Sequence, residues 1–195
     1  MTISQSSLKN IYENITEGSV IAFYHNEWYW QLIPFFTREN KGERVPHHIA
    51  ICYEIVRKNN TVLFKVSEQN FTGAKYRSVV IHRSLTNTFY TPDKYFKKQD
   101  LITLHKVNMN AEQVKLGIAD AREQIGKRYG YSKLIFAAEF LEKILPKRFF
   151  KWLNKKQDLR ICSTHIAYNL QKAGFTLPKD DFLSPLEITK LNIYF

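Results

Sequence analysis

Several features that would fix a compartment or a chemistry are missing from this sequence. Two cysteines, Cys52 and Cys162, are too few for a disulfide framework. The N-terminal segment, residues 1–10, lacks the basic region and the apolar run of a secretory signal. No stretch approaches the run of roughly 20 apolar residues that a membrane-spanning helix needs. We therefore expect a cytoplasmic protein whose thiols stay reduced.

Familiar catalytic signatures are missing as well. The sequence has no CxxC pair and no HExxH, which are typical of zinc sites, and it has no glycine-rich phosphate loop. It also lacks the GxSxG turn of serine hydrolases and any conspicuous pair of carboxylates. These absences lead us to expect a protein without a metal ion or another cofactor.

What the sequence does have is the composition of one folded domain. It contains 195 residues, of which 44% are apolar and 14% aromatic, enough to bury a core and too few for two ordinary domains. We treat residues 1–195 as a single domain. The formal net charge of +11 favours an anionic partner such as nucleic acid, anionic lipid or a wall polymer, although no specific nucleic-acid motif is present.

Hydrophobic alternation comes first along the chain and helical periodicity comes later. We expect a helix or arm over residues 3–15 and strands over residues 20–24, 48–56, 61–71, 75–85 and 100–107. Asn59 and Asn60 separate the second and third of these strands, which indicates a hairpin. Hairpins produce an antiparallel sheet, here of about five strands. Strands followed by helices indicate an α+β domain with segregated layers.

Helical periodicity begins at Ala111. The spacing predicts a helix that Gly126 and Gly130 bring to an end. A second helix is expected over residues 131–145, with a break at Pro146. The residues expected on the apolar face of the first helix are Val114, Ile118, Ala121 and Ile125.

The helix that says most about chemistry begins at Cys162. Ile166, Leu170 and Ala173 recur at spacings of three and four, which indicates one buried face, and Gly174 suits the helix C-terminus. A thiol at a helix N-terminus feels the positive end of the helix dipole, which favours the thiolate that a nucleophile needs. Most free cysteines are buried packing residues, so Cys162 taken alone fits a place in the core equally well.

A nucleophilic cysteine needs an imidazole to accept its proton, and the sequence offers six histidines. His48 opens an otherwise apolar strand, where a polar side chain is unusual unless it is paired or lies in a site. His47 would point to the opposite face of that strand, so only one of the two can face a site. His165 lies near Cys162 on the same helical face, but its short reach leaves little room for a substrate. The remaining histidines have no supporting context: His25, His82 and His105.

An imidazole base usually needs an acceptor that holds the ring in one tautomer. The strand expected to pair with that of His48 contains one acid, Glu68, at the end of an apolar alternation. A carboxylate in this position could orient the ring. The alternative is a solvated carboxylate at the end of a strand, with no catalytic role.

Taken together, these segments resemble one known family. A strand that runs HIAI from His48 is followed by a strand with Glu68 near its end, and later by a helix that begins CS at Cys162 and ends AGF. In order and type they are similar to the circularly permuted NlpC-type papain-like cysteine hydrolases. The most similar branch is YiiX/YebB-like, and lecithin:retinol acyltransferase is a more distant relative.

Further segments extend the resemblance over roughly residues 18–185. The segment GSVIAF resembles the strand start of the family, with Ser19 where an acid is usual. The segment GKRY places Tyr129 at a step that resembles the family's G-x-x-Y. Each of these matches is short, and it is their common order along the chain that gives them weight.

The resemblance implies a permuted papain-like fold and a catalytic triad in the chain order His, acid, Cys. It assigns Cys162 as the nucleophile, His48 as the base and Glu68 as the residue that orients the base. The implied activity is that of a thiol hydrolase, peptidase-like or amidase-like, which cleaves an amide or ester bond through a thioester. The implied substrates are peptides, peptidoglycan fragments or lipids, and the sequence does not choose among them.

The basic and aromatic segment 134–157 has no counterpart in the resemblance. We interpret it as a helical insertion that covers the site or contacts an anionic surface. Its part around Phe149, Phe150 and Trp152 could lie on a membrane, although an ordinary exposed helix is the simpler reading because the apolar face is short. Two other functions therefore stay open. One is a lipid-directed acyltransferase with the same triad, and the other is a catalytically silent binding module with a basic surface.

Overall fold

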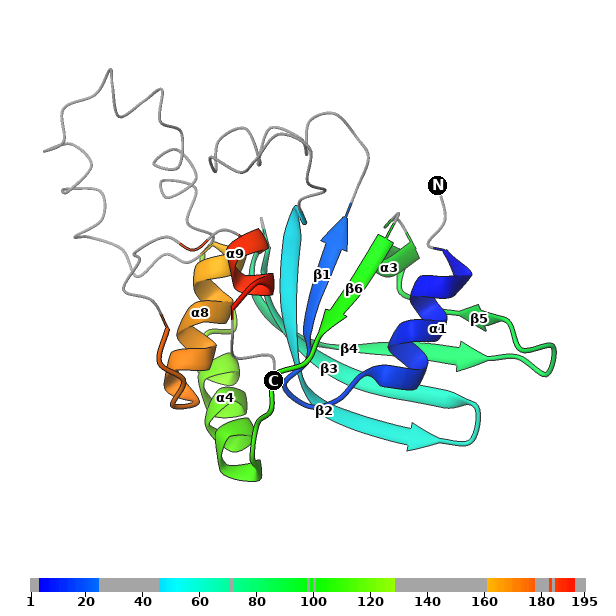
Figure 1. The fold of residues 1–195 in the computed structure, drawn as a ribbon, viewed down its shortest axis with the longest axis horizontal. Helices are drawn as coiled ribbons and strands as arrows, with labels where there is room; N and C mark the ends of the chain where they lie inside the picture. Colours follow the sequence, from blue (N-terminus) through cyan, green and yellow to red (C-terminus); the bar gives the residue numbers. More distant parts are fainter. Residues whose placement is uncertain are drawn as a thin grey trace, which may run out of the picture.

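The computed structural model of the chain describes residues 4–24, 46–70, 72–97, 99, 101–128, 161–177, 183 and 185–191. Over these residues the chain forms an α+β structure around one curled antiparallel sheet, with helices packed on both faces (Figure 1). The α+β class and the antiparallel sheet predicted from the sequence are therefore confirmed.

The sheet has six strands in the order β5-β4-β3-β2-β1-β6, and every pair of neighbours is antiparallel. Five of the six strands match the predicted ranges to within a few residues. The additional strand, β5, has only two residues, which is too short for alternation to reveal. The strands are β1 (Val20–Tyr24), β2 (His48–Lys58), β3 (Thr61–Asn70), β4 (Gly73–Arg83), β5 (Phe89–Tyr90) and β6 (Leu101–His105).

Helices cover the two faces of the sheet unequally. Helix α1 lies on one face near β6, whereas α4 and α8 lie side by side on the other face, with α9 beside α8 (Figure 1). Local caps explain where two of them begin, because the side chains of Ser4 and Asn110 each accept a hydrogen bond from a backbone N–H of the first turn. The helices are α1 (Gln5–Asn14), α3 (Lys94–Lys97), α4 (Ala111–Glu123), α8 (Cys162–Lys172) and α9 (Pro185–Thr189).

Apolar side chains are buried on both faces of the sheet, and β1 lies between the two layers with all five of its residues buried. One cluster joins the sheet to α1 and α3 through Leu8, Ile11, Phe23, Phe64, Val79 and Phe96. The other cluster joins the sheet to α4, α8 and α9 through Val20, Ile49, Ile51, Tyr53, Ile166, Leu170 and Ile188. Burial of this kind contributes roughly 25 cal/mol per Å² of apolar area, so the two clusters hold the helices against the sheet.

The end of α4 differs from the prediction. The helix stops at Glu123, and Ile125, which was expected on its apolar face, is 55% exposed. The chain turns away here because Gly126 adopts a left-handed backbone, with φ of 80°, and its N–H donates to the carbonyl of Ala74 at 3.0 Å. The last turn of the apolar pattern is thereby taken out of the helix. At the end of α8 the prediction fits better, because Gly174 has a φ of 88°.

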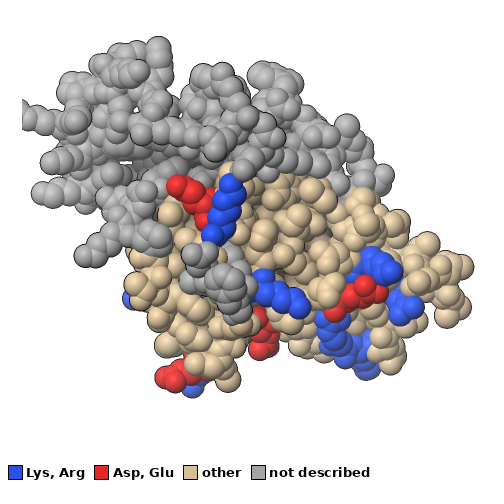
Figure 2. Space-filling view, viewed as in Figure 1, with Lys and Arg blue, Asp and Glu red and all other residues tan. Residues whose placement is uncertain are grey.

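Two other expectations concern the surface. In the view of Figure 2, the Lys and Arg side chains of the described residues lie in separate groups, several with acidic neighbours, and form no continuous basic patch on that face. The predicted insertion 134–157, Tyr129 and His25 lie outside the described residues. Among the helices that the structure describes, none has both the length and the hydropathy needed to cross a bilayer.

Candidate active site

Cys162, His48 and Glu68 come together from three different elements. Cys162 is the first residue of α8, His48 is the first residue of β2, and Glu68 lies near the end of β3. All three are buried, with exposed fractions of 5%, 6% and 2%. The carboxylate therefore does not behave as the solvated strand-end group that was the alternative for Glu68.

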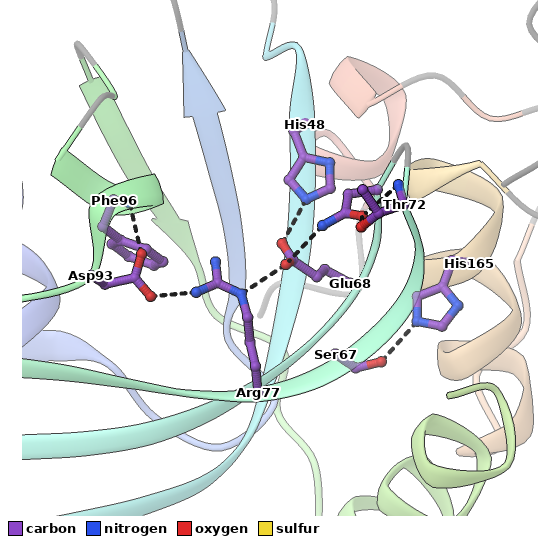
Figure 3. A network of polar contacts seen from close by, with 9 residues as sticks. His48, Ser67, Glu68, Thr72, Arg77, Asp93, Phe96 and His165 are labelled. Atoms are coloured by element: carbon purple, nitrogen blue, oxygen red, sulfur yellow. Dashed lines mark hydrogen bonds and ion pairs between the residues drawn. The ribbon is translucent and has the colours of Figure 1, made fainter. Parts of the chain in front are cut away.

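His48 and Glu68 form a buried ion pair. The Nε2 atom of His48 donates a hydrogen bond to Oε2 of Glu68 across 2.9 Å (Figure 3). Burial alone raises the pKa of Glu68, but the hydrogen bond and the charge of His48, together with the charge of Arg77, outweigh burial and lower that pKa to about 2. The carboxylate is therefore ionised throughout the neutral range.

His48 interacts with Cys162 as well as with Glu68. Burial lowers the pKa of His48, but side-chain hydrogen bonds with Cys162 and Glu68 raise it to about 9. An imidazole ring has two nitrogens, and since Nε2 is bound to Glu68, Nδ1 is the nitrogen left for the thiol. The ring of Phe23 packs beside the imidazole, with centroids 5.5 Å apart. The arrangement favours a charged imidazolium next to the sulfur.

The start of α8 leaves backbone N–H groups available near the thiol. The residue before the helix, Ile161, has a side chain that cannot accept a hydrogen bond, and none caps this helix end among the described residues. The hydroxyl of Thr164, in the first turn, instead accepts a hydrogen bond at 2.9 Å from the N–H of Ile161, the residue just before the helix. N–H groups that no described side chain caps and the helix dipole together favour negative charge at this point, either a thiolate or an oxyanion.

Two residues that the sequence analysis does not identify extend the site. Arg77 on β4 donates from Nε to Oε1 of Glu68 at 2.7 Å, so that both carboxylate oxygens are engaged (Figure 3). The same guanidinium forms an ion pair through Nη1 with Oδ2 of Asp93. The sequence does contain a signal, because Arg77 occupies the same alternating face of its strand as Val79 and Ile81, which are buried.

His165 lies close in sequence to Cys162 but has a different partner. Its Nε2 atom is hydrogen-bonded to Oγ of Ser67 at 2.7 Å, and both residues are fully buried between α8 and β3 (Figure 3). Ser67 and Glu68 are neighbours on β3 and therefore face opposite sides of the sheet. His165 therefore joins α8 to β3 through Ser67, whereas Glu68 points to the other face of the sheet and binds His48.

The remaining described histidines have local partners. His47 is buried immediately before β2, and its backbone N–H donates to the carbonyl of Phe23. His82 is hydrogen-bonded to Thr61 at 3.0 Å, and His105 to Thr103 at 3.0 Å. Burial lowers the pKa of His105. Within the described ranges, no group of three His, Cys, Asp or Glu side chains is arranged to hold a metal ion.

The second cysteine behaves differently from Cys162. Cys52 lies inside β2 and is fully buried, and burial raises the pKa of its thiol. A thiol in this state is inert, so Cys52 serves as an internal reference for the reactivity of Cys162. Comparison with known proteins adds no family to this geometry, since no family model and no curated protein matches the sequence.

Proposed function

We propose that the protein is a cysteine hydrolase that cleaves an amide or ester bond, with Cys162 as nucleophile, His48 as acid and base, and Glu68 as the residue that orients His48. One observation carries the proposal: His48 is buried and hydrogen-bonded to Glu68 at 2.9 Å, and its interactions with Cys162 and Glu68 raise its pKa in spite of burial. Thiol catalysis requires this combination of a nucleophile, a base and an orienting acceptor.

We also propose that the fold is of the circularly permuted papain-like type. The order of the elements supports this proposal, since the strand that bears His48 and the strand that bears Glu68 precede the helix that begins with Cys162. Further support comes from the packing of α8 against β2 and β3, which brings the start of a late helix to the ends of two early strands.

The proposed reaction begins with an imidazolium–thiolate pair. The sulfur attacks the carbonyl carbon, the carbonyl π electrons move to oxygen, and the N–H groups at the start of α8 stabilise the resulting oxyanion. When the tetrahedral species collapses, the bond to the leaving group breaks, and His48 gives its proton to the departing amine or alcohol. A thioester on Cys162 and a neutral imidazole remain.

Hydrolysis of the thioester restores the starting state. The neutral imidazole of His48 removes a proton from water, and the hydroxide oxygen attacks the thioester carbonyl. Collapse releases the carboxylic acid and expels the sulfur as a thiolate, which pairs again with the imidazolium. Glu68 keeps its charge throughout and holds Nε2 of His48, so that Nδ1 stays directed at the sulfur.

A catalytically silent binding module is less well supported by this geometry. Burying charged groups costs several kcal/mol for each ion, and a binding module has no use for a buried ion pair beside a thiol. A lipid-directed acyltransferase would use the same three residues, and it differs only in the molecule that accepts the acyl group. The fate of the acyl-enzyme therefore separates the hydrolase from the acyltransferase.

The proposal is tested with p-nitrophenyl acetate, an activated ester that reports on both halves of the reaction. We expect a burst of p-nitrophenol, an acetyl group on the peptide that contains Cys162, and none on Cys52. The Cys162→Ser and His48→Ala variants should lose the burst, whereas His82→Ala, a histidine with a partner outside the site, should keep it. A burst of unchanged size in Cys162→Ser would refute the proposed nucleophile. A decay rate of the acetyl-enzyme that added amines or alcohols do not increase supports hydrolysis, whereas a rate that rises with their concentration supports acyl transfer.

A further inference from the structure

We propose that Arg77 is a positioning residue of this site. It fixes the Glu68 carboxylate in the orientation in which Glu68 binds His48, and Asp93 in turn anchors Arg77. The inference rests on the proposed function and extends the triad by two residues. It starts from the alignment of three neighbouring strands, since His48, Glu68 and Arg77 lie on β2, β3 and β4 in turn.

The strand register places Arg77 beside Glu68 on one face of the sheet. Glu68 pairs with Lys75 across β3 and β4, and Arg77 lies two residues further along β4. Residues two apart on a strand face the same side, and diagonal neighbours lie within reach of long side chains. The backbone ladder therefore fixes the approach of the guanidinium to the carboxylate, independently of any loop.

Both oxygens of Glu68 are in use, and this limits how the carboxylate can rotate. Oε2 accepts from His48 at 2.9 Å, and Oε1 accepts from Nε of Arg77 at 2.7 Å. A third and longer contact, 3.4 Å from Nδ2 of Asn70, also reaches Oε1. If Arg77 were absent, the carboxylate could turn about its own bond, and Oε2 would no longer be held opposite the imidazole.

Arg77 is itself held at several points. Its Nη1 pairs with Oδ2 of Asp93, and its guanidinium carbon lies 5.8 Å from the centre of the Phe96 ring. Asp93 is fixed in turn, because its Oδ1 accepts the backbone N–H of Phe96 at 3.0 Å (Figure 3). The backbone N–H of Asp93 also donates to Oγ1 of Thr91 at 3.1 Å. The planar guanidinium can reach two carboxylates at once, which the single ammonium of a lysine cannot do in the same geometry.

A purely structural ion pair would explain the same contacts, so the test must separate the two roles. A structural role predicts lost stability with unchanged chemistry at Cys162. A positioning role predicts a folded variant in which the sulfur reacts more slowly and the ring of His48 has lost its fixed hydrogen bond. In metal sites, removing the group that orients a functional histidine costs about 10- to 100-fold, and we expect a loss in this range.

The experiment compares full-length Arg77→Met, Arg77→Lys and Asp93→Asn with the parent protein. The first readout is the rate of Cys162 alkylation by iodoacetamide at about pH 6, where an unassisted thiol is almost wholly protonated. The second is the NMR signal of the proton on Nε2 of His48. Arg122→Met is the matched control, because Arg122 also pairs with a glutamate, Glu54, but on the surface of the sheet.

We expect alkylation of Cys162 to slow about 10- to 100-fold in Arg77→Met. The Nε2 proton signal should broaden or disappear through exchange with water. Arg77→Lys and Asp93→Asn should show intermediate losses, and Arg122→Met should match the parent. Parental alkylation and an intact signal in folded Arg77→Met would overturn the proposal.

Two other results have defined meanings. If Arg77→Met does not fold, the alkylation rate and NMR signal of Asp93→Asn test the proposal instead. This variant keeps the bond between Arg77 and Glu68 and removes only the ion pair of Arg77 with Asp93. Parental behaviour of that variant would also overturn the proposal. If the parent itself shows no fast alkylation, the proposed nucleophile fails, while the signal of His48 still reports whether Arg77 positions Glu68.

Discussion

Glu68 lies diagonally across the β2–β3 pair from His48. In the register of the two strands Glu68 faces Ala50, and its carboxylate reaches past that position to Nε2 of His48 at 2.9 Å. Diagonal neighbours on one face of an antiparallel pair lie within reach of long side chains. The geometry of the base and its acceptor is therefore set by a hydrogen-bonded ladder, which holds a site more rigidly than a loop does.

The charge of Glu68 is expected to control the reactivity of Cys162. Glu68→Gln keeps the shape of the side chain but removes the charge that favours the imidazolium of His48. We expect alkylation of Cys162 by iodoacetamide at about pH 6 to slow by about tenfold or more, the effect of a change of about one pKa unit at the base. The rate is measured by mass spectrometry of the peptide that contains Cys162.

Glu54→Gln is the matched control for this experiment. Glu54 also has a lowered pKa, caused mainly by its hydrogen bond with Lys65, but it lies on the surface of β2. Its substitution should leave the alkylation rate unchanged. Equal rates in Glu68→Gln and Glu54→Gln would show that the buried carboxylate plays no part in the reactivity of the thiol.

The ion pair of His48 and Glu68 also predicts how stability depends on pH. The pKa of His48 is raised from 6.5 to about 9, so its contribution is complete below 6.5 and is lost as the pH rises through about 9. The pKa of Glu68 is lowered from 4.5 to about 2, so its contribution is complete above 4.5 and is lost as the pH falls through about 2. The pair stabilises the fold most between these two ordinary values.

A double-mutant cycle with His48→Ala and Glu68→Gln measures this contribution by urea denaturation. We expect a coupling free energy of about 3 kcal/mol at about pH 5.5, where both groups are charged in the folded and in the unfolded state. The coupling should fall at about pH 10, where His48 is neutral. A coupling energy that does not change between these two pH values would contradict the ion pair.

Alternation along β3 and β4 was sufficient to predict which residues of each strand share a face, up to the bulge in β2. His48 and Glu68 each occupy the apolar face of a strand, and a polar side chain in that position indicates a paired or functional group. Arg77 carries the same signal on β4. The resemblance to a known family, however, assigned no role to Arg77. Its contact with Glu68 also depends on how β3 and β4 pair, which alternation alone does not determine.

The pairing of His48 with Glu68 could not be predicted by counting from the hairpin turn. Lys58 pairs with Thr61 next to the turn. If that register continued, Glu68 would face Ile51, and His48 would point to the other side of the sheet. A one-residue shift in β2 is therefore needed to bring the histidine and the carboxylate together.

A β-bulge around Tyr53 provides this shift, and after it Ala50 faces Glu68. The local sequence does not mark the bulge with a glycine. Its position is supported by tertiary contacts instead, because Tyr53 is fully buried and its hydroxyl donates to Oδ1 of Asn169 on α8 at 3.3 Å. Contacts of this kind join residues that are far apart in the sequence, which is why a pattern read along the chain does not reveal them.

Ser67→Ala tests the assignment of His165 to structure. The substitution removes the side-chain hydroxyl of Ser67 and breaks its 2.7 Å bond to Nε2 of His165, where both residues are fully buried. Leaving a buried polar group without its partner costs about 1–3 kcal/mol, which urea denaturation measures. Alkylation of Cys162 at about pH 6 should stay close to the parental rate. A large loss of reactivity without a loss of stability would instead indicate that His165 assists the thiol.

Gly117→Ala tests the packing of α4 against the bulge. A Cβ atom at Gly117 would lie 2.3 Å from Cε1 of Tyr53, far inside van der Waals contact. Alanine is the better helix former by about 1 kcal/mol, so helix propensity alone predicts a stabilised protein. Overpacking of a buried ring costs about 1–3 kcal/mol, and we expect this effect to prevail because the ring of Tyr53 is fixed by its bond to Asn169.

The sign of this effect should reverse when the ring is removed. In the Tyr53→Ala background the contact is absent, so Gly117→Ala should then stabilise the protein through helix propensity. Urea denaturation of the four proteins measures both signs. If Gly117→Ala stabilises the parent as well, the close approach of α4 to β2 is wrong.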